Sequence, residues 1–220
     1  MASLREDLVE YSKKLSEKNM VIGPGGNTSI REGDFMYIKP SGLSFPELTV
    51  DDLVEVEIAT GTVTPHHLKP SSEVLLHLYI YQVRDVNCIF HAHPPFVNGI
   101  TARDIPFRHM FPDSVVYLGR TIPVIDYCVP CTETLAEYVR DNFQDSLAIV
   151  LKNHGAITVG ENPKTAYLRM EILEGLAYTI WIAKSINDVT PLSYLSDQDI
   201  EDVLALDSEK YRQNLLKDKK

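Results

Sequence analysis

The stretches "DLVEVEIATGTV" (52–63), "SSEVLLHLYIYQV" (71–83) and "NCIFHAH" (87–93) indicate three different elements in succession. The first alternates apolar and polar residues before a glycine turn, which is typical of a β-hairpin. The second has an apolar face with helical spacing, so we expect Ser71 or Ser72 to cap a helix. The third reads as a buried strand. Hairpins beside helices argue against a purely parallel βαβ repeat and predict an α/β fold, a three-layer α/β/α sandwich with a mixed, largely antiparallel central sheet.

Helices and strands stay interleaved along the rest of the chain. Leucines and a tyrosine spaced by three and four residues predict an amphipathic helix over residues 2–19. Further helices are expected at 95–104, 132–143 and 162–186, and strands at 121–127 and 147–160. At 220 residues, with no repeat or linker, the chain is expected to form a single domain over 1–220.

The bulk composition narrows the possible partners. Hydrophobic residues make up 44% and charged residues 24% of the chain, as in ordinary globular proteins. No apolar run approaches the roughly 20 residues that span a bilayer, and the charged N-terminus has no signal-peptide core. We therefore expect a cytoplasmic protein with no membrane partner. A net charge of −10 argues against nucleic acid but not against small phosphate esters, which backbone N–H groups can hold.

Three histidines and one acid have the spacing of a metal site. His91 and His93 are two residues apart at a strand end, so their side chains share one face. His154 ends another apolar strand, and Gly155 after it permits a close backbone approach. With Glu73, these residues match a catalytic zinc site. Taken singly, the histidine pair can be a half-exposed pair, and Glu73 can be an acid favoured by the helix dipole.

Two Gly/Ser-rich turns, "GPGGNTS" (23–29) and "PSG" (40–42), offer backbone N–H groups and hydroxyls that can cradle a phosphate. The serines at the start of the helix around 71–83 are a further candidate anion site, although such turns and caps are common without a ligand. The flanking Lys39, Lys69 and Lys152 are interpreted either as positive charge around the phosphate or as solvated side chains, and the solvated role is favoured.

The cysteine pattern gives little support to redox chemistry. "CVPC" (128–131) matches C-x-x-C, which allows a redox motif or half of a zinc site. No second cysteine pair completes a four-thiolate site, so Cys88, Cys128 and Cys131 are expected to be reduced thiols packed in the protein.

Five motifs in order carry a family resemblance: "GGNTS" (25–29), "IKPSG" (38–42), "KPSSE" (69–73), "HAH" (91–93) and "NHG" (153–155). With these intervals the chain resembles the class II aldolase and adducin-like family, in particular its members that act on L-fuculose 1-phosphate. The resemblance covers a core of about residues 5–187 and leaves 188–220 as a helical tail.

The resemblance implies a site and an assembly. One Zn²⁺ per subunit would be held by His91, His93 and His154, with Glu73 as a fourth ligand in the resting state. The phosphate of a small sugar phosphate would be bound by Gly26, Asn27, Ser41, Gly42, Ser71 and Ser72. The fold would be built around nine strands and assembled as a C4 homotetramer with active sites between subunits. The reaction would cleave a ketose 1-phosphate to dihydroxyacetone phosphate and an aldehyde, with Glu73 as the base.

Within the family, three readings stay open: an aldolase, a 4-epimerase or other sugar-phosphate enzyme such as a dehydratase or decarboxylase on the same scaffold, and a non-catalytic module. The aldolases carry Glu at position 73, whereas the L-ribulose-5-phosphate 4-epimerases carry Asp there and use an Asp of a neighbouring subunit, for which Asp113 is a candidate. Members that lack the metal ligands are non-catalytic modules, but this chain keeps all three histidines. Met110 stands where the resemblance places a catalytic tyrosine, after Ile105 and Pro106. The candidate phenols are therefore Tyr117 and, in the tail, Tyr211.

Overall fold

The computed structural model describes residues 3–143, 146–187 and 189–217. Its centre is a sheet of seven strands in the order β3-β2-β1-β4-β7-β6-β5. The strands are β1 (Asn27–Glu32), β2 (Phe35–Ile38), β3 (Val54–Glu57), β4 (Cys88–Ala92), β5 (Val124–Ile125), β6 (Ala148–Leu151) and β7 (Gly155–Gly160). Every pair is antiparallel except β5 with β6, which confirms the expected mixed, largely antiparallel sheet.

The described residues form seven strands, not the nine that the family resemblance implies. The hairpin expected over 52–63 is also shorter than a full pair of strands. Its return leg makes only an isolated bridge between Val56 and Val63. Pro65 follows two residues later and has no backbone N–H for a ladder, so the pairing stops there.

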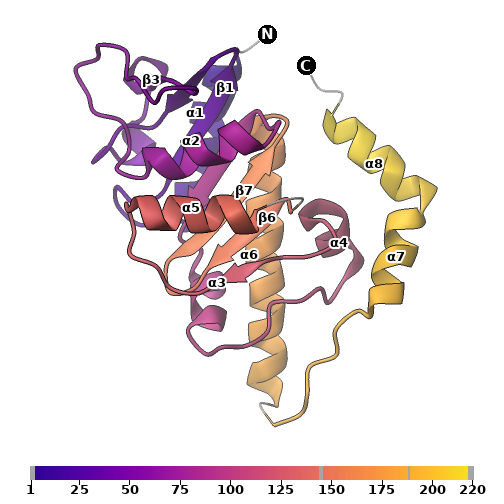
Figure 1. Cartoon of the computed structure of the whole chain (residues 1–220). Helices are drawn as coiled ribbons and strands as arrows, with labels where there is room; N and C mark the ends of the chain where they lie inside the picture. Colours follow the sequence, from indigo (N-terminus) through magenta and orange to yellow (C-terminus); the bar gives the residue numbers. More distant parts are fainter. Residues whose placement is uncertain (1–2, 144–145, 188, 218–220) are drawn as a thin grey trace.

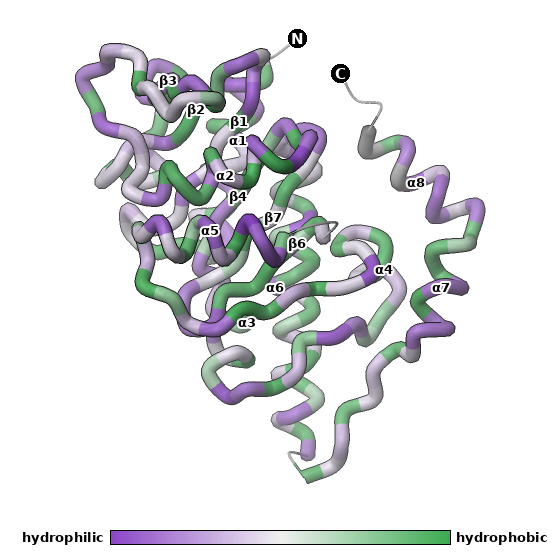
Figure 2. The backbone as a smooth tube through the Cα atoms, in the orientation of Figure 1, coloured by the Kyte–Doolittle hydropathy of each residue, from purple (hydrophilic) through white to green (hydrophobic). Residues whose placement is uncertain are grey.

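Helices cover both faces of the sheet and make the three expected layers (Figure 1). They are α1 (Leu4–Glu17), α2 (Val74–Val83), α3 (Pro95–Thr101), α4 (Pro112–Leu118), α5 (Glu133–Asn142), α6 (Pro163–Ile186), α7 (Asp197–Ala205) and α8 (Asp207–Lys217). One apolar core joins α1, α3 and α6 to one face of the sheet, and a second core joins α2 and α5 to the other. The central strands β6 and β7 are largely hydrophobic because they are buried between these layers (Figure 2).

Alternation along β4 decides which side chains reach which layer. Phe90 belongs to the core on the α6 side, whereas Ile89 belongs to the core under α2. His91 is two residues from Ile89 and therefore faces α2 as well. On β1, Asn27 is paired with His91 and shares that face.

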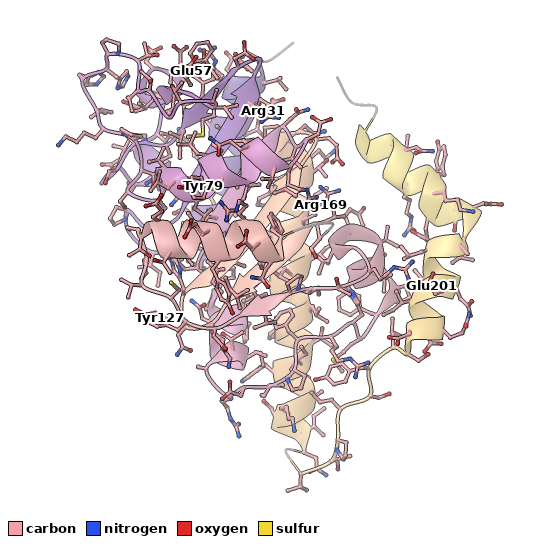
Figure 3. The ribbon with its side chains drawn as sticks, in the orientation of Figure 1. Arg31, Glu57, Tyr79, Tyr127, Arg169 and Glu201 are labelled. Atoms are coloured by element: carbon pink, nitrogen blue, oxygen red, sulfur yellow. The ribbon has the colours of Figure 1, made fainter. Side chains whose placement is uncertain are left out.

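The C-terminal helices lie along the outside of the molecule (Figure 1). Ile200 of α7 is buried, and an ion pair joins Glu201 (labelled in Figure 3) to Arg120. Residues 188 and 218–220 of the expected tail lie outside the described residues. Among the residues described, no helix is long and apolar enough to cross a membrane.

The start of α2 differs from the expected serine cap. The residue preceding the helix is Glu73, and no side chain caps the helix. The Ser71 hydroxyl instead accepts a hydrogen bond from the Glu73 N–H at 3.2 Å, and the Ser71 carbonyl accepts one from Val74 N–H. Because Ser71 satisfies these amides within the turn, the carboxylate of Glu73 is left to point elsewhere.

Gly155 provides a test of how tightly the sheet is packed beneath the histidines. A Cβ there would lie 2.2 Å from the carbonyl oxygen of Ala92 and 2.9 Å from the His93 ring. Gly155→Ala should therefore lower the free energy of unfolding by about 2 kcal/mol or more, measured by urea denaturation. Gly175→Ala in α6 is the matched control, because a Cβ there meets nothing and should stabilise the helix by about 0.5–1 kcal/mol. Equal effects of the two substitutions would contradict this account.

Candidate metal and phosphate site

Three histidines meet at one end of the central strands. His91 is on β4, His93 follows β4 directly, and His154 lies in the turn between β6 and β7. Pairing of β4 with β7 brings this turn beside the end of β4. The candidate ligand nitrogens of the three rings all lie within 4.8 Å of one another. The Nε2 atoms of His91 and His93 are 3.2 Å apart. The structure thus brings together the three histidines singled out in the sequence.

The carboxylate of Glu73 lies between two of these rings. Its Oε2 is 3.2 Å from His91 Nε2, and its Oε1 is 3.3 Å from His154 Nε2. Burial alone would raise the pKa of Glu73, but the charge of His91 and the close approach of the His91 and His154 rings hold the pKa of this carboxyl well below its usual range. Burial would also lower the pKa of His91, but the nearby Glu73 carboxylate has the larger total effect and raises the pKa of this ring. Burial lowers the pKa of His93 to about 3.

The donor set fits a divalent cation. His91 donates its Nδ1–H to the carbonyl of Ala156 at 3.0 Å, which leaves the Nε2 lone pair of the neutral ring facing its neighbours. Glu73 Oε1 is buried and accepts no hydrogen bond from the described residues. Three imidazoles and one displaceable carboxylate are a donor set typical of catalytic zinc. The chain can therefore hold a metal at this point.

A hollow of about 300 Å³ opens beside the histidines. It is lined by Glu73, His93 and His154 together with all six residues expected to bind phosphate: Gly26, Asn27, Ser41, Gly42, Ser71 and Ser72. Gly26 and Gly42 have positive φ angles of 67° and 79°. A Cβ on Gly26 would lie 2.7 Å from Val21 and 2.9 Å from the carbonyl oxygen of His91, so only glycine fits this backbone. The two Gly/Ser-rich turns and the serines before α2 thus line one cavity.

The interpretation of the flanking lysines as solvated side chains is wrong for Lys39. Its side chain is not solvated: the residue is 2% exposed, lines the hollow and donates to the carbonyl of Pro24 at 3.0 Å. It forms no ion pair with any described residue, and burial lowers its pKa to about 8. Lys152, by contrast, pairs with Asp104 at 2.5 Å. The sequence position of Lys39 could have indicated its burial. It follows directly after a strand in which Met36 and Ile38 are fully buried.

The two candidate tyrosines lie outside this hollow in the single chain. Tyr117 of α4 lines a separate hollow of about 400 Å³ with Arg212 and Leu215 of α8. Tyr211 is 65% exposed. Asp113 is exposed and pairs with Arg212 at 3.3 Å. The structure of one subunit does not bring these residues to the histidines.

The cysteines are all free. Cys88 is buried as expected, but Cys131 is exposed, so the expectation of three packed thiols is wrong for Cys131. Cys131 lines the hollow and donates its S–H to the Ser72 hydroxyl at 3.2 Å.

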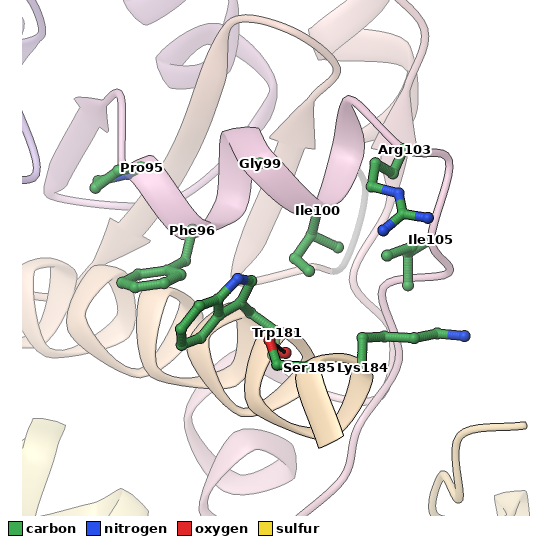
Figure 4. A pocket seen from close by; sticks show the side chains of 9 residues that line it. All are labelled: Pro95, Phe96, Gly99, Ile100, Arg103, Ile105, Trp181, Lys184 and Ser185. Carbon is green, nitrogen blue, oxygen red and sulfur yellow. Dashed lines mark hydrogen bonds between the residues drawn. The ribbon is translucent and has the colours of Figure 1, made fainter. Parts of the chain in front are cut away.

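A larger hollow, about 510 Å³, lies between α3 and α6 (Figure 4). Its wall includes Phe96, Ile100 and Trp181, and the side chain of Trp181 faces Phe96 across a ring distance of 5.4 Å. Among the described residues, its lining contains no histidine, cysteine or carboxylate. It is larger than the hollow beside the histidines, but its size alone does not make it the reaction site.

Known proteins share both the sequence pattern and the fold. The profile of the family described as "Class II Aldolase and Adducin N-terminal domain" matches residues 6–181. The chain is 35% identical over 185 residues to an L-fuculose phosphate aldolase of Methanococcus maripaludis, covering 82% of this chain and 99% of that protein. It is 32% identical over 189 residues to a 5-deoxy-D-ribulose 1-phosphate aldolase of Bacillus thuringiensis, covering 84% and 87% respectively.

A solved structure of an L-fuculose 1-phosphate aldolase superposes with a TM-score of 0.84 at 30% identity, covering 96% of this chain and 98% of that one. The match extends over the strands and turns that carry His91, His93 and His154. The chain therefore belongs to the class II aldolase and adducin family, among its aldolase enzymes.

Proposed function

We propose that the protein is a zinc-dependent aldolase that cleaves a ketose 1-phosphate resembling L-fuculose 1-phosphate. The products would be dihydroxyacetone phosphate and an aldehyde. The observation that carries this proposal is that Glu73, His93, His154 and the two Gly/Ser-rich turns line a single small hollow, with His91 grouped with the other two histidines at its edge. The relatives named above supply the substrate class: one is named for L-fuculose phosphate and another for 5-deoxy-D-ribulose 1-phosphate.

His91, His93 and His154 would hold the metal, with Glu73 as the ligand that substrate displaces. A bound zinc ion supplies a Lewis acid that polarises the ketose carbonyl where negative charge develops. Glu73 suits the displaceable position because its Oε1 accepts no hydrogen bond from the described residues that would hold it in place.

The substrate phosphate would bind in the turns at the other end of the hollow. The residues proposed for it are Gly26, Asn27, Ser41, Gly42, Ser71 and Ser72. We add Lys39 to this proposal because it lines the same hollow. The buried ammonium group of Lys39 has no carboxylate partner among the described residues, so an incoming dianion would supply its missing counter-charge. This end fixes the substrate so that its reacting carbons reach Glu73.

Glu73 would be the general base at carbon. In cleavage, the C3–C4 bond breaks, its electron pair moves toward the C2 oxygen, and the C4 hydroxyl loses its proton as the aldehyde forms. Glu73, displaced by substrate and protonated from solvent, would then deliver that proton to the resulting enediolate at the carbon that becomes C1 of dihydroxyacetone phosphate, and in the reverse, condensing direction it would take the same proton up as the base. The proton lost by the C4 hydroxyl would pass through a phenol on the aldehyde side to solvent.

We further propose a homotetramer in which a neighbouring subunit supplies that phenol, Tyr117 or Tyr211. Both tyrosines lie outside the hollow in one chain. An unpartnered aromatic face supports assembly, since Trp181 is 48% and Tyr178 is 45% exposed and their rings stack at 5.8 Å.

A panel of ketose phosphates tests the function. We expect dihydroxyacetone phosphate from L-fuculose 1-phosphate or a 5-deoxy-ketose 1-phosphate, measured by a coupled assay. Conversion of L-ribulose 5-phosphate to its C4 epimer without release of dihydroxyacetone phosphate would support the 4-epimerase instead. Failure to bind zinc or turn over any of these compounds would leave a non-catalytic module.

Loss of one histidine should remove the metal. We expect His91→Ala and His154→Ala to lose most of the one zinc bound per subunit, because two imidazoles and a carboxylate no longer close the site. Metal analysis after dialysis measures this loss. His67→Ala removes an exposed imidazole and is the control. Full zinc occupancy in His91→Ala would contradict the proposed ligand set.

Replacement of Glu73 by glutamine should distinguish its role as a base from its role as a metal ligand. Glu73→Gln keeps the size but cannot take up the proton, so turnover should fall by roughly 10² or more. Zinc should stay, held by three histidines. Exchange of the C1 proton of dihydroxyacetone phosphate with deuterated water, followed by NMR, measures the step at carbon directly. Wild-type exchange rates in Glu73→Gln would contradict the role of Glu73 as base.

Lys39 should make phosphate binding depend on pH. Its pKa of about 8 means that the free enzyme loses this positive charge as pH rises through 8. The phosphate ester is already a dianion, so dihydroxyacetone phosphate should bind roughly 8-fold more weakly at pH 9 than at pH 7.5. Calorimetric titration measures both affinities. Lys39→Met should bind about 10-fold or more weakly at pH 7.5 and lose this pH dependence, whereas the exposed Lys69→Met should behave as wild type.

A further inference from the structure

A row of buried polar residues runs from Glu73 into the core beneath α2. On α2, His77 and Tyr81 follow Glu73 at intervals of four, so the three side chains form one stripe. On β1, Asn27 and Ser29 are two apart and share the face toward α2. Four helical residues rise about 6 Å and two strand residues about 6.6 Å. The two rows therefore stay in step, and each helix residue meets a strand residue.

Four hydrogen bonds join the row without interruption. Tyr81 and Ser29 are linked at 2.9 Å between hydroxyl oxygens, and Ser29 Oγ is 2.7 Å from His77 Nδ1. His77 Nε2 lies 2.5 Å from Asn27 Oδ1, and Asn27 Nδ2 donates to Glu73 Oε2 at 2.8 Å. Asn27, Ser29, His77 and Tyr81 are each at most 3% exposed. At the far end, Arg31 of β1 (Figure 3) reaches the carbonyl of Tyr81.

The direction of every bond follows from the charge at one end. A carboxylate only accepts, so Asn27 presents its amide N–H to Glu73 and its oxygen to His77. That oxygen requires a donor, so His77 carries its proton on Nε2. The buried ring is neutral, and its Nδ1 must then accept from Ser29. Ser29 in turn accepts from Tyr81. All donors thus point along the row toward Glu73.

The two oxygens of Glu73 consequently have different surroundings. Each oxygen lies near a histidine Nε2, but only Oε2 also accepts a hydrogen bond, from the Asn27 N–H. Oε1, 3.3 Å from His154 Nε2, is buried without a hydrogen bond from the described residues. We infer that His77 is a positioning residue that, through Asn27, fixes the Glu73 carboxylate so that Oε1 is the oxygen that exchanges the proton with substrate. This inference rests on the proposed function. Without the Nε2–H of His77, the Asn27 amide can turn over and present its oxygen to the carboxylate.

The key variants separate positioning from packing. His77→Phe fills the ring volume but removes both polar contacts, so turnover and C1-proton exchange should fall roughly 10- to 100-fold, the scale reported for groups that orient ligands. KM should change less than 3-fold, and zinc content should be unchanged. His77→Gln offers a donor and an acceptor in the same order and should recover most of the activity. If His77→Phe does not fold, Ser29→Ala removes the hydrogen bond to Nδ1 with the ring in place.

Thr28→Val is the matched control. Thr28 lies between Asn27 and Ser29 on β1 but points to the opposite face, where its fully buried hydroxyl bonds Ser12 at 2.7 Å. This variant should lower the melting temperature about as much as Ser29→Ala does and keep wild-type turnover. Equal losses of turnover in Thr28→Val and His77→Phe would overturn the inference, as would wild-type turnover in His77→Phe.

A spectroscopic readout tests the row independently of the reaction. Imidazole ¹⁵N NMR of the zinc-loaded protein should show His77 as the neutral tautomer protonated on Nε2. The Nδ1–H tautomer would reverse the hydrogen bonds and overturn the inference. If wild type releases dihydroxyacetone phosphate from none of the ketose phosphates, the proposed function fails, and the tautomer still decides for or against the row.

Discussion

The arrangement depends on a carboxylate that is placed in the protein interior among three imidazoles. Glu73 is only 7% exposed, and burying a charge is costly unless it is paired and hydrogen-bonded. His91, His154 and Asn27 supply that compensation. Because each partner comes from a different strand or turn, the compensation exists only when β1, β4 and the β6–β7 turn are assembled around the start of α2. Fold and site therefore stabilise each other.

The antiparallel register of β1 and β4 fixes where the residues that compensate this buried charge lie. Asn27 is paired with His91, so the first residue of β1 and the first metal-binding candidate lie side by side. Gly26, directly before Asn27, lets the backbone pass within contact of the His91 carbonyl. The turn proposed to bind phosphate and the histidines proposed to bind metal are consequently adjacent along one strand pair. A substrate that spanned both ends of this 300 Å³ hollow would be held with its reacting carbons beside Glu73.

Local pattern was enough to predict the layers and most of the site. The alternation before Gly61, the helical face over 71–83 and the buried strand expected over 87–93 indicated a mixed α/β sandwich, which the structure confirms. The ordered motifs placed the ligand and phosphate candidates, and all line or border one hollow. Strand number and helix capping were predicted less well, because Pro65 and the Ser71 turn act through hydrogen bonds that depend on neighbouring segments.

The sequence by itself determined the candidate site residues, because H-x-H on a strand and glycine beside a histidine express local geometry. Only the tertiary structure decided what lies around them. Lys39 is surrounded by buried chain, and Tyr117 lines a different hollow from the candidate site. His77 becomes important only when α2 packs on β1 and sets it between Ser29 and Asn27. Burial and hydrogen-bond partners are properties of segments distant in sequence, so no local pattern contains them.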